Sequence, residues 1–265
     1  MTARATAWVF GWWLGASAAV SAQEAAPDPA ALLDRAATDP KALRELQRFE
    51  EMMANPMIVN QHPDLRYRDL AMAAYKHGDK ERALRMFMRA GAFADKPSQA
   101  AVANMYWEGV GTPVDRPRAY AWMDLASSRG YNRFIAQREY YWSQLSEAER
   151  AQALRVGQEI LVEYDDTVAL HRLEMELEYV RRNVTGSRVG SIGWGTIQGA
   201  GVTSAYNPNA PSWMTLDQFY RSSVWNIDSY TKMKDLQWKV QVESRPTVEV
   251  GDLQNVKSPS PPSGK

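Results

Sequence analysis

Hydrophobic residues recur at spacings of three and four through most of the first 182 residues, as Leu43, Leu46 and Phe49 do. This spacing is typical of amphipathic helices. The pattern predicts helices at residues 30–38, 40–55, 64–76, 80–92, 97–108, 116–129 and 131–143, followed by one long helix over 147–182. Ser146 and Glu149 have the spacing of a capping box, which marks the start of that long helix.

The pattern changes after residue 183, where glycine and serine become frequent. Residues 213–237 predict mostly helix, and residues 238–250 alternate with β-branched side chains as a short strand does. Residues 251–265 end in a Ser/Pro-rich stretch that predicts a disordered tail. The predicted fold class is therefore all-α, with a Gly-rich, irregular or partly β C-terminal segment.

Two segments in the middle of the chain repeat one pattern, at residues 75–91 and 106–127. Each has Tyr-x-x-Gly, then Asp-x-x-Arg-Ala, then large residues three and four positions on and alanine at seven. The alanines would lie on one helix face and allow close helix contact, the aspartates would cap the second helix, and large residues would pack beside them. The residues in these three roles are Ala83, Ala90, Ala119 and Ala126; Asp79 and Asp115; and Met86, Phe87, Trp122 and Met123. Gly109 and Gly111 would let the chain turn sharply after the first helix of the second unit.

The second unit resembles the Sel1-like repeat, a relative of the tetratricopeptide repeat, whose pattern is Leu-Gly-x-x-Tyr-x-x-Gly-x-Gly-Val-x-x-Asp-x-x-Lys-Ala-x-x-Trp-Tyr. It differs from that pattern in Val102 and Ala103 for Leu-Gly, Thr112 for Val, Arg118 for Lys and Met123 for Tyr. The first unit is degenerate, with Ala94 where the second has Gly130. The resemblance covers residues 64–143. It implies a short superhelical solenoid of antiparallel helix pairs, a role in protein–protein interaction, and neither catalytic residues nor a cofactor.

The N-terminus has the three parts of a secretory signal peptide: a positive charge at Arg4, an apolar run over residues 7–19, and the small residues Val20-Ser21-Ala22. This order predicts cleavage before Gln23 and a periplasmic or secreted protein. The alternative is an uncleaved membrane anchor, for which the apolar run is short.

The absence of cysteine excludes thiol catalysis and cysteine-based zinc sites. The 31 basic residues balance the 31 acidic ones, so the charge offers no general case for nucleic-acid binding. His171 and Glu174 have a spacing that could present two metal ligands, but their neighbours are those of a solvated helix face. The glycines at 193, 195 and 199 do not have the dinucleotide-binding spacing. We therefore predict no enzyme activity, no metal and no cofactor.

Aromatic residues are concentrated in the repeats, where most should pack in the core and some could bind a partner, because Tyr and Trp often anchor interfaces. The candidate partner-binding residues are Trp107, Tyr120, Tyr131 and Tyr141. The predicted function is an exported scaffold or adaptor that binds a protein partner in the cell envelope. The alternative is a cell-wall-associated accessory protein that contacts peptidoglycan or another glycan through its aromatic C-terminal segment, which contains Trp194, Trp213, Trp225 and Trp238.

The predicted organisation is a signal peptide (1–22), an N-terminal linker and helices (23–63), the repeats (64–143), a long capping helix (144–182), a C-terminal segment to which the sequence assigns no definite fold (183–250) and a disordered tail (251–265). Leu154, Leu161 and Val168 should cover the last hairpin. Residues 23–182 are expected to fold alone. Alternatively, the C-terminal segment runs back along the repeat groove and completes the core.

Overall fold

The computed structural model describes residues 29–183, 195–198 and 213–243. These residues are mostly helical. Their elements are α1 (Pro29–Ala36), α2 (Pro40–Met53), α3 (Pro56–Val59), α4 (Pro63–Lys76), α5 (Lys80–Gly91), α6 (Lys96–Glu108), α7 (Arg116–Ser127), α8 (Asn132–Gln144), α9 (Glu147–Tyr164), α10 (Asp166–Asn183), β1 (Thr196–Gln198), β2 (Trp213–Thr215), α11 (Leu216–Phe219), α12 (Ser222–Trp225), α13 (Ile227–Trp238) and a π-helical turn, η1 (Lys239–Glu243). The predicted signal peptide and tail lie outside the described residues.

The helices predicted before residue 144 are confirmed to within one or two residues at most ends. Side-chain caps explain where several begin: Asp79 and Asp115 accept the backbone N–H groups of Arg82 and Arg118. Asp95 caps α6 in the same way. The predicted capping box at Ser146 is also present at the start of α9.

Helices α4 and α5 pack as one hairpin and α6 and α7 as the next. Ala83, Ala90, Ala119 and Ala126 are all fully buried, which confirms that the helices approach closely at these small residues. Gly109 and Gly111 have φ angles of 71° and 72°, a left-handed conformation that favours glycine. Within the described residues only one other residue type takes such a φ, at Ala94 (61°).

The prediction of one long helix over 147–182 is wrong, because the helix breaks at Asp165 into α9 and α10. Asp165 is extended (ψ 147°), and its carboxylate accepts the N–H and hydroxyl of Thr167. The predicted packing face is also wrong: Leu154, Leu161 and Val168 are 59, 44 and 39% exposed. The neighbouring helix faces are buried instead, at Ala153, Val156 and Ile160 on α9 and at Ala169, Leu173 and Leu177 on α10.

The predicted strand at 238–250 is helical wherever the structure describes it, because α13 continues into η1. The described strands lie elsewhere. β1 and β2 form an antiparallel pair in which Ile197 lies opposite Met214. The prediction that residues 213–237 are mostly helical is confirmed by α11, α12 and α13.

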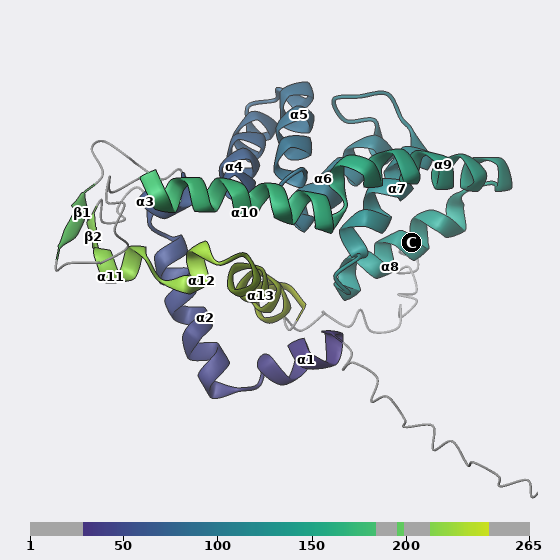
Figure 1. Ribbon diagram of the computed structural model, residues 1–265. Helices are drawn as coiled ribbons and strands as arrows, with labels where there is room; N and C mark the ends of the chain where they lie inside the picture. The colour runs from purple at the N-terminus through teal and green to yellow at the C-terminus, as the bar shows by residue number, and fades with distance from the viewer. Residues whose placement is uncertain (1–28, 184–194, 199–212, 244–265) are drawn as a thin grey trace, which may run out of the picture.

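The buried hydrophobic residues form two cores. The first joins helices α4 to α9 around Trp122 and Phe87. The second is built from distant parts of the chain: Phe49 on α2, Leu173 on α10 and Trp225 on α12 are among its buried members. Helix α10 connects the two, since it contacts α4 as well as α12 and α13 (Figure 1).

This packing joins the N-terminal helices to the C-terminal segment and supports the alternative in which that segment completes the fold. Trp225 is 3% exposed, and the Trp238 ring lies 4.6 Å from the Phe134 ring of α8.

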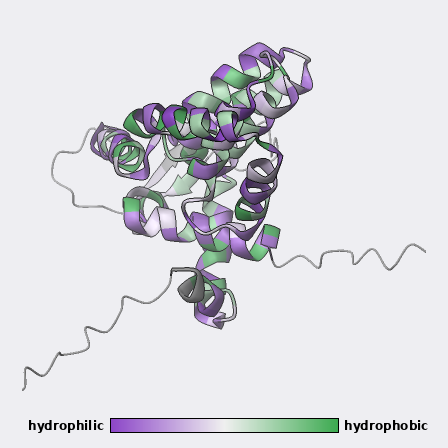
Figure 2. Ribbon diagram, turned by 90° about the vertical axis from the view of Figure 1, so that its right-hand side faces the viewer, coloured by the Kyte–Doolittle hydropathy of each residue, from purple (hydrophilic) through white to green (hydrophobic). Residues whose placement is uncertain are grey.

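Hydrophilic and hydrophobic residues alternate along the helices in Figure 2. Among the residues described, no helix has both the length and the apolar character needed to span a bilayer.

Candidate functional site

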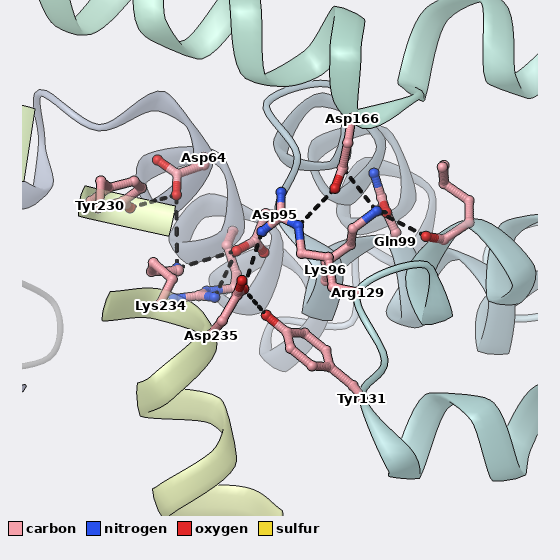
Figure 3. Close-up of polar contacts among 12 residues, drawn as sticks. Asp64, Asp95, Lys96, Gln99, Arg129, Tyr131, Asp166, Tyr230, Lys234 and Asp235 are labelled. Atoms are coloured by element: carbon pink, nitrogen blue, oxygen red, sulfur yellow. Dashed lines mark hydrogen bonds and ion pairs between the residues drawn. The ribbon is translucent and has the colours of Figure 1, made fainter. Parts of the chain in front are cut away.

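A network of buried charges lies where α13 meets the repeat helices (Figure 3). It is organised by two pairs of neighbouring residues of opposite charge. Asp95 and Lys96 stand at the start of α6, and Lys234 and Asp235 lie on α13. Each pair contributes one residue to each of two clusters, which are therefore linked through both helices.

In the first cluster the Lys234 ammonium is 3.4 Å from Asp95 Oδ1 and 3.7 Å from Asp64 Oδ2. Arg68 is 2.9 Å from Asp95 Oδ1, and the Tyr230 hydroxyl donates to Asp64 at 2.6 Å. Burial raises the pKa of Asp64, although Lys234 opposes the shift. Burial would also raise the pKa of Asp95, but Arg68 and Lys234 bring it below its ordinary value. Asp95 is therefore the ionised anchor of this cluster.

In the second cluster the Lys96 ammonium is 2.9 Å from Asp166 Oδ1. It also donates to the carbonyl oxygen of Leu125 at 2.9 Å and to Gln99 Oε1 at 3.1 Å. Burial lowers the pKa of Lys96 to about 8, while Asp166 acts in the opposite direction. The Lys96 side chain is fully buried, and its ammonium contacts three oxygen atoms of the fold.

Arg129 and Tyr131, which follow α7, complete the second cluster. Arg129 Nε is 2.7 Å from Asp166 Oδ2, and Arg129 Nη1 is 3.4 Å from Asp235 Oδ1. The Tyr131 hydroxyl donates to Asp235. The network thus brings opposite charges into contact, and it leaves Asp64 Oδ1 and Arg129 Nη2 without a hydrogen-bond partner within the described residues. Such an arrangement anchors α13 to the repeats.

His62 lies beside the first cluster and is completely buried. Its ring is 5.3 Å from that of Trp225 and 4.7 Å from that of Tyr230, and neither of its ring nitrogens has a hydrogen-bond partner within the described residues. Burial lowers its pKa to about 3, and the nearby charge of Lys234 adds to the shift. His62 is therefore neutral and serves as a flat packing surface.

An open groove of about 650 Å³ lies on the outside of the repeats, between the α6–α7 turn and α9. Its walls combine apolar and charged side chains: Tyr106, Thr112, Pro113, Val114, Asp115, Arg116, Pro117, Glu149 and Gln152. Val114 is 58% exposed, so the groove has an apolar rim that is open to a ligand. Its volume is in the range of ordinary ligand-binding sites.

Two aromatic pairs lie where the repeat helices meet α8, Trp107 with Tyr140 and Tyr120 with Trp142, and we call these four residues the aromatic face. Arg116 connects the groove to the face, because its guanidinium lies 5.2 Å from the centre of the Trp107 ring. The ring of Trp107 is 6.3 Å from that of Tyr140, and Tyr120 is 4.8 Å from Trp142. Tyr140 is 53% exposed, and the other three side chains are half-buried.

The four predicted partner-binding residues divide into two groups. Trp107 and Tyr120 belong to the aromatic face and retain exposed surface. Tyr141 is 2% exposed, stacks on Trp107 at 3.9 Å and donates to Asn104. Tyr131 is 4% exposed and stacks on Trp238. Tyr131 and Tyr141 thus have partners within the chain and little surface left for another protein.

The C-terminal tryptophans differ in the same way. Trp225 and Trp238 pack within the fold, whereas Trp213 on β2 is 55% exposed. Trp194 lies outside the described residues. This arrangement leaves one described tryptophan of this segment free to stack on a glycan ring.

His171 and Glu174 face a second groove of about 430 Å³ between α10 and α13. His171 Nδ1 is 3.8 Å from Glu174 Oε2, and both side chains are exposed. In the described parts of the chain, no three metal-ligating side chains gather at one place.

The residues of the charge network were missed by sequence reasoning. Asp95-Lys96 and Lys234-Asp235 look like ordinary charges of solvated helices, and nothing local indicates that they meet.

Comparison with protein-family models, with curated proteins and with solved structures found no match for this chain.

Proposed function

We propose that this protein is an exported, non-enzymatic scaffold that binds a protein partner at the groove and aromatic face on the outside of its repeats. In this proposal the two hairpins, α4–α5 and α6–α7, are Sel1-like units of a short superhelical stack, with α9 covering the end. The close packing of α6 and α7 at Ala119 and Ala126 supports that interpretation.

The observation that carries the proposal is the composition of this surface. Tyr, Trp and Arg are the residue types most enriched among residues that dominate binding energy at protein interfaces. Here Arg116, Trp107 and Tyr140 stand together beside a groove on a helical framework, with Trp107 supported from below by Tyr141. Such pre-positioned side chains lose little conformational entropy on binding.

The position of α13 gives the second argument. Its residues Tyr230, Lys234 and Asp235 contact Asp64, Asp95 and Tyr131, none of which lines the outer groove. Helix α13 is held on its side by buried ion pairs that a partner would have to break, so the outer surface is the better binding site.

Site-specific cross-linking tests this proposal. A photoreactive amino acid at Val114 should form a discrete adduct in envelope extract, and one at Val162 on α9 should not, although Val162 is 78% exposed. Arg116→Glu should abolish the adduct, whereas Arg155→Glu, at an exposed position on α9, should preserve it. An adduct that survives Arg116→Glu, or that forms equally at Val162, would argue against this surface.

Export is part of the proposal. N-terminal sequencing of the mature protein should begin at Gln23. A mature chain that still contains residues 8–14 would place the protein in the membrane through an anchor instead.

Glycan binding stays as a second candidate function because of the exposure of Trp213. Retention of the protein on peptidoglycan that is lost on Trp213→Ala, with Arg116→Glu having no effect, would favour this role.

A further inference from the structure

The described chain ends close to the start of α8. Glu243, the last residue of η1, accepts a hydrogen bond from Asn132 Nδ2 at 3.4 Å and forms an ion pair with Lys239 at 3.1 Å. Asn132 is the first residue of α8, and Tyr140 and Trp142 stand eight and ten residues further along the same helix. At about 1.5 Å per residue, they lie roughly 12–15 Å from its start.

The chain that follows Glu243 is long enough to reach the aromatic face. Pro259 is 16 residues beyond Glu243 (259 − 243), which corresponds to about 50 Å of extended chain. This length is about three times the roughly 12–15 Å that separate the start of α8 from Tyr140 and Trp142. Reach therefore permits the contact without any change in the described fold.

The chemistry of that stretch matches the surface. Residues 258–262 read Ser-Pro-Ser-Pro-Pro. Prolines fix φ near −65° and favour the extended polyproline II conformation, so such a segment loses little entropy on binding. Proline-rich segments are recognised by grooves lined with aromatic rings, against which the pyrrolidine rings pack. The two aromatic pairs, Trp107 with Tyr140 and Tyr120 with Trp142, supply rings of this kind.

We propose that the groove and aromatic face bind proline-rich extended segments, and that residues 258–262 of the same chain are the resident occupant. This inference rests on the proposed binding role of the surface and names the class of ligand. A partner then binds by displacing the chain's own segment, which makes the tail an intramolecular competitor.

The test uses the full chain labelled with 5-fluorotryptophan and followed by fluorine NMR, with the signals assigned through single Trp→Phe variants. Pro259→Ala, Pro261→Ala and Pro262→Ala are combined in one variant. The control combines Ser258→Ala, Ser260→Ala and Ser263→Ala, which changes the same segment but keeps its prolines. The proline variant should shift the signals of Trp107 and Trp142 but not that of the exposed Trp213 on β2. The serine variant should leave all three unchanged.

A synthetic peptide of residues 255–265 supplies the second measurement. The tethered segment has an effective concentration of about 1 mM at the surface. If its own dissociation constant is about 0.1 mM, it lowers the apparent affinity of a free peptide roughly tenfold. The peptide should therefore bind the proline variant about tenfold more tightly than the native chain. Unchanged tryptophan signals, or equal peptide binding to both chains, would overturn the proposal.

A third measurement addresses the origin of the occupant. The signal difference should be independent of protein concentration, and the native chain should elute as a monomer. A concentration-dependent difference would show that a second copy supplies the segment, which contradicts an intramolecular occupant.

Cross-linking at Val114 to a partner is a separate measurement. Its success together with unchanged tryptophan signals would leave the binding surface intact and remove only the role of the tail.

Discussion

Gly111 and Gly130 allow the packing between the two repeat units to be measured with a matched pair of substitutions. Both have a left-handed backbone, with φ of 72° and 77°. A Cβ at Gly130 would have no neighbour within 4 Å, whereas a Cβ at Gly111 would lie 2.5 Å from the backbone of Lys80 at the start of α5. Only Gly111 therefore places the turn of the second unit directly against the first.

The two alanine variants should differ for this reason. A left-handed conformation costs an L-residue about 1–2 kcal/mol, and Gly130→Ala should lose only this amount of unfolding free energy. Gly111→Ala should lose the same amount plus roughly 1–3 kcal/mol of steric strain, because backbone atoms on both sides must move apart. Urea titration followed by circular dichroism measures both losses, with Gly78→Ala as a second open control (φ 86°). Equal midpoints for Gly111→Ala and Gly130→Ala would refute the close contact between the units.

Three further predictions concern the second core and the charge network. Asp166→Asn should lower the free energy of unfolding by about 3–5 kcal/mol, because it removes the counter-charge of Lys96 and Arg129. The control Asp217→Asn changes a carboxylate that is 89% exposed and should change that free energy by no more than about 1 kcal/mol. The lowered pKa of His62 means that the folded state binds fewer protons than the unfolded state. The free energy of unfolding should therefore decrease as the pH falls from 6.5 to about 3, by about 1.4 kcal/mol per pH unit. Denaturant titrations of His62→Phe should lack this part of the pH dependence. Truncation after Arg182 should give a fragment without a cooperative melting transition, since it removes Trp225, Tyr230 and Leu236 from the second core; a soluble, sharply melting fragment would show that the repeats fold alone.

The local parts of the fold were predictable because their causes lie within a few residues. The alanines at 83, 90, 119 and 126 mark a helix contact by their seven-residue spacing, and the aspartates before α5 and α7 mark where those helices begin. The break at Asp165 is marked only by an aspartate that caps the next helix, since neither proline nor glycine stands there. It arises because α9 buries its face against α7 while α10 buries its own face against α4, α12 and α13.

The candidate site was predictable only in part. Trp107 and Tyr120 were identified by residue type, since aromatic residues near a repeat are frequent interface residues. Tyr131 and Tyr141 have the same signature but are covered by Trp238 and Trp107, and only the tertiary packing distinguishes the two groups. The role of Lys96 was hidden for a related reason: lysine is normally exposed, and its acceptor Asp166 stands 70 residues away (166 − 96).

The alternation of charge along the network explains how a polar interface fixes the position of α13. Lys234 faces Asp64 and Asp95, and its neighbour Asp235 faces Arg129. A shift of α13 by one residue would exchange the two and bring Asp235 toward the aspartates and Lys234 toward Arg129, so like charges would meet in a buried place. A purely apolar helix could slide or rotate at little cost, whereas this one has a single register with every charge matched. The register in turn sets Trp238 against Tyr131 and Phe134 and places Glu243 beside Asn132. The buried network thereby determines where the rest of the chain leaves the fold, at the end of α8 opposite to the aromatic face.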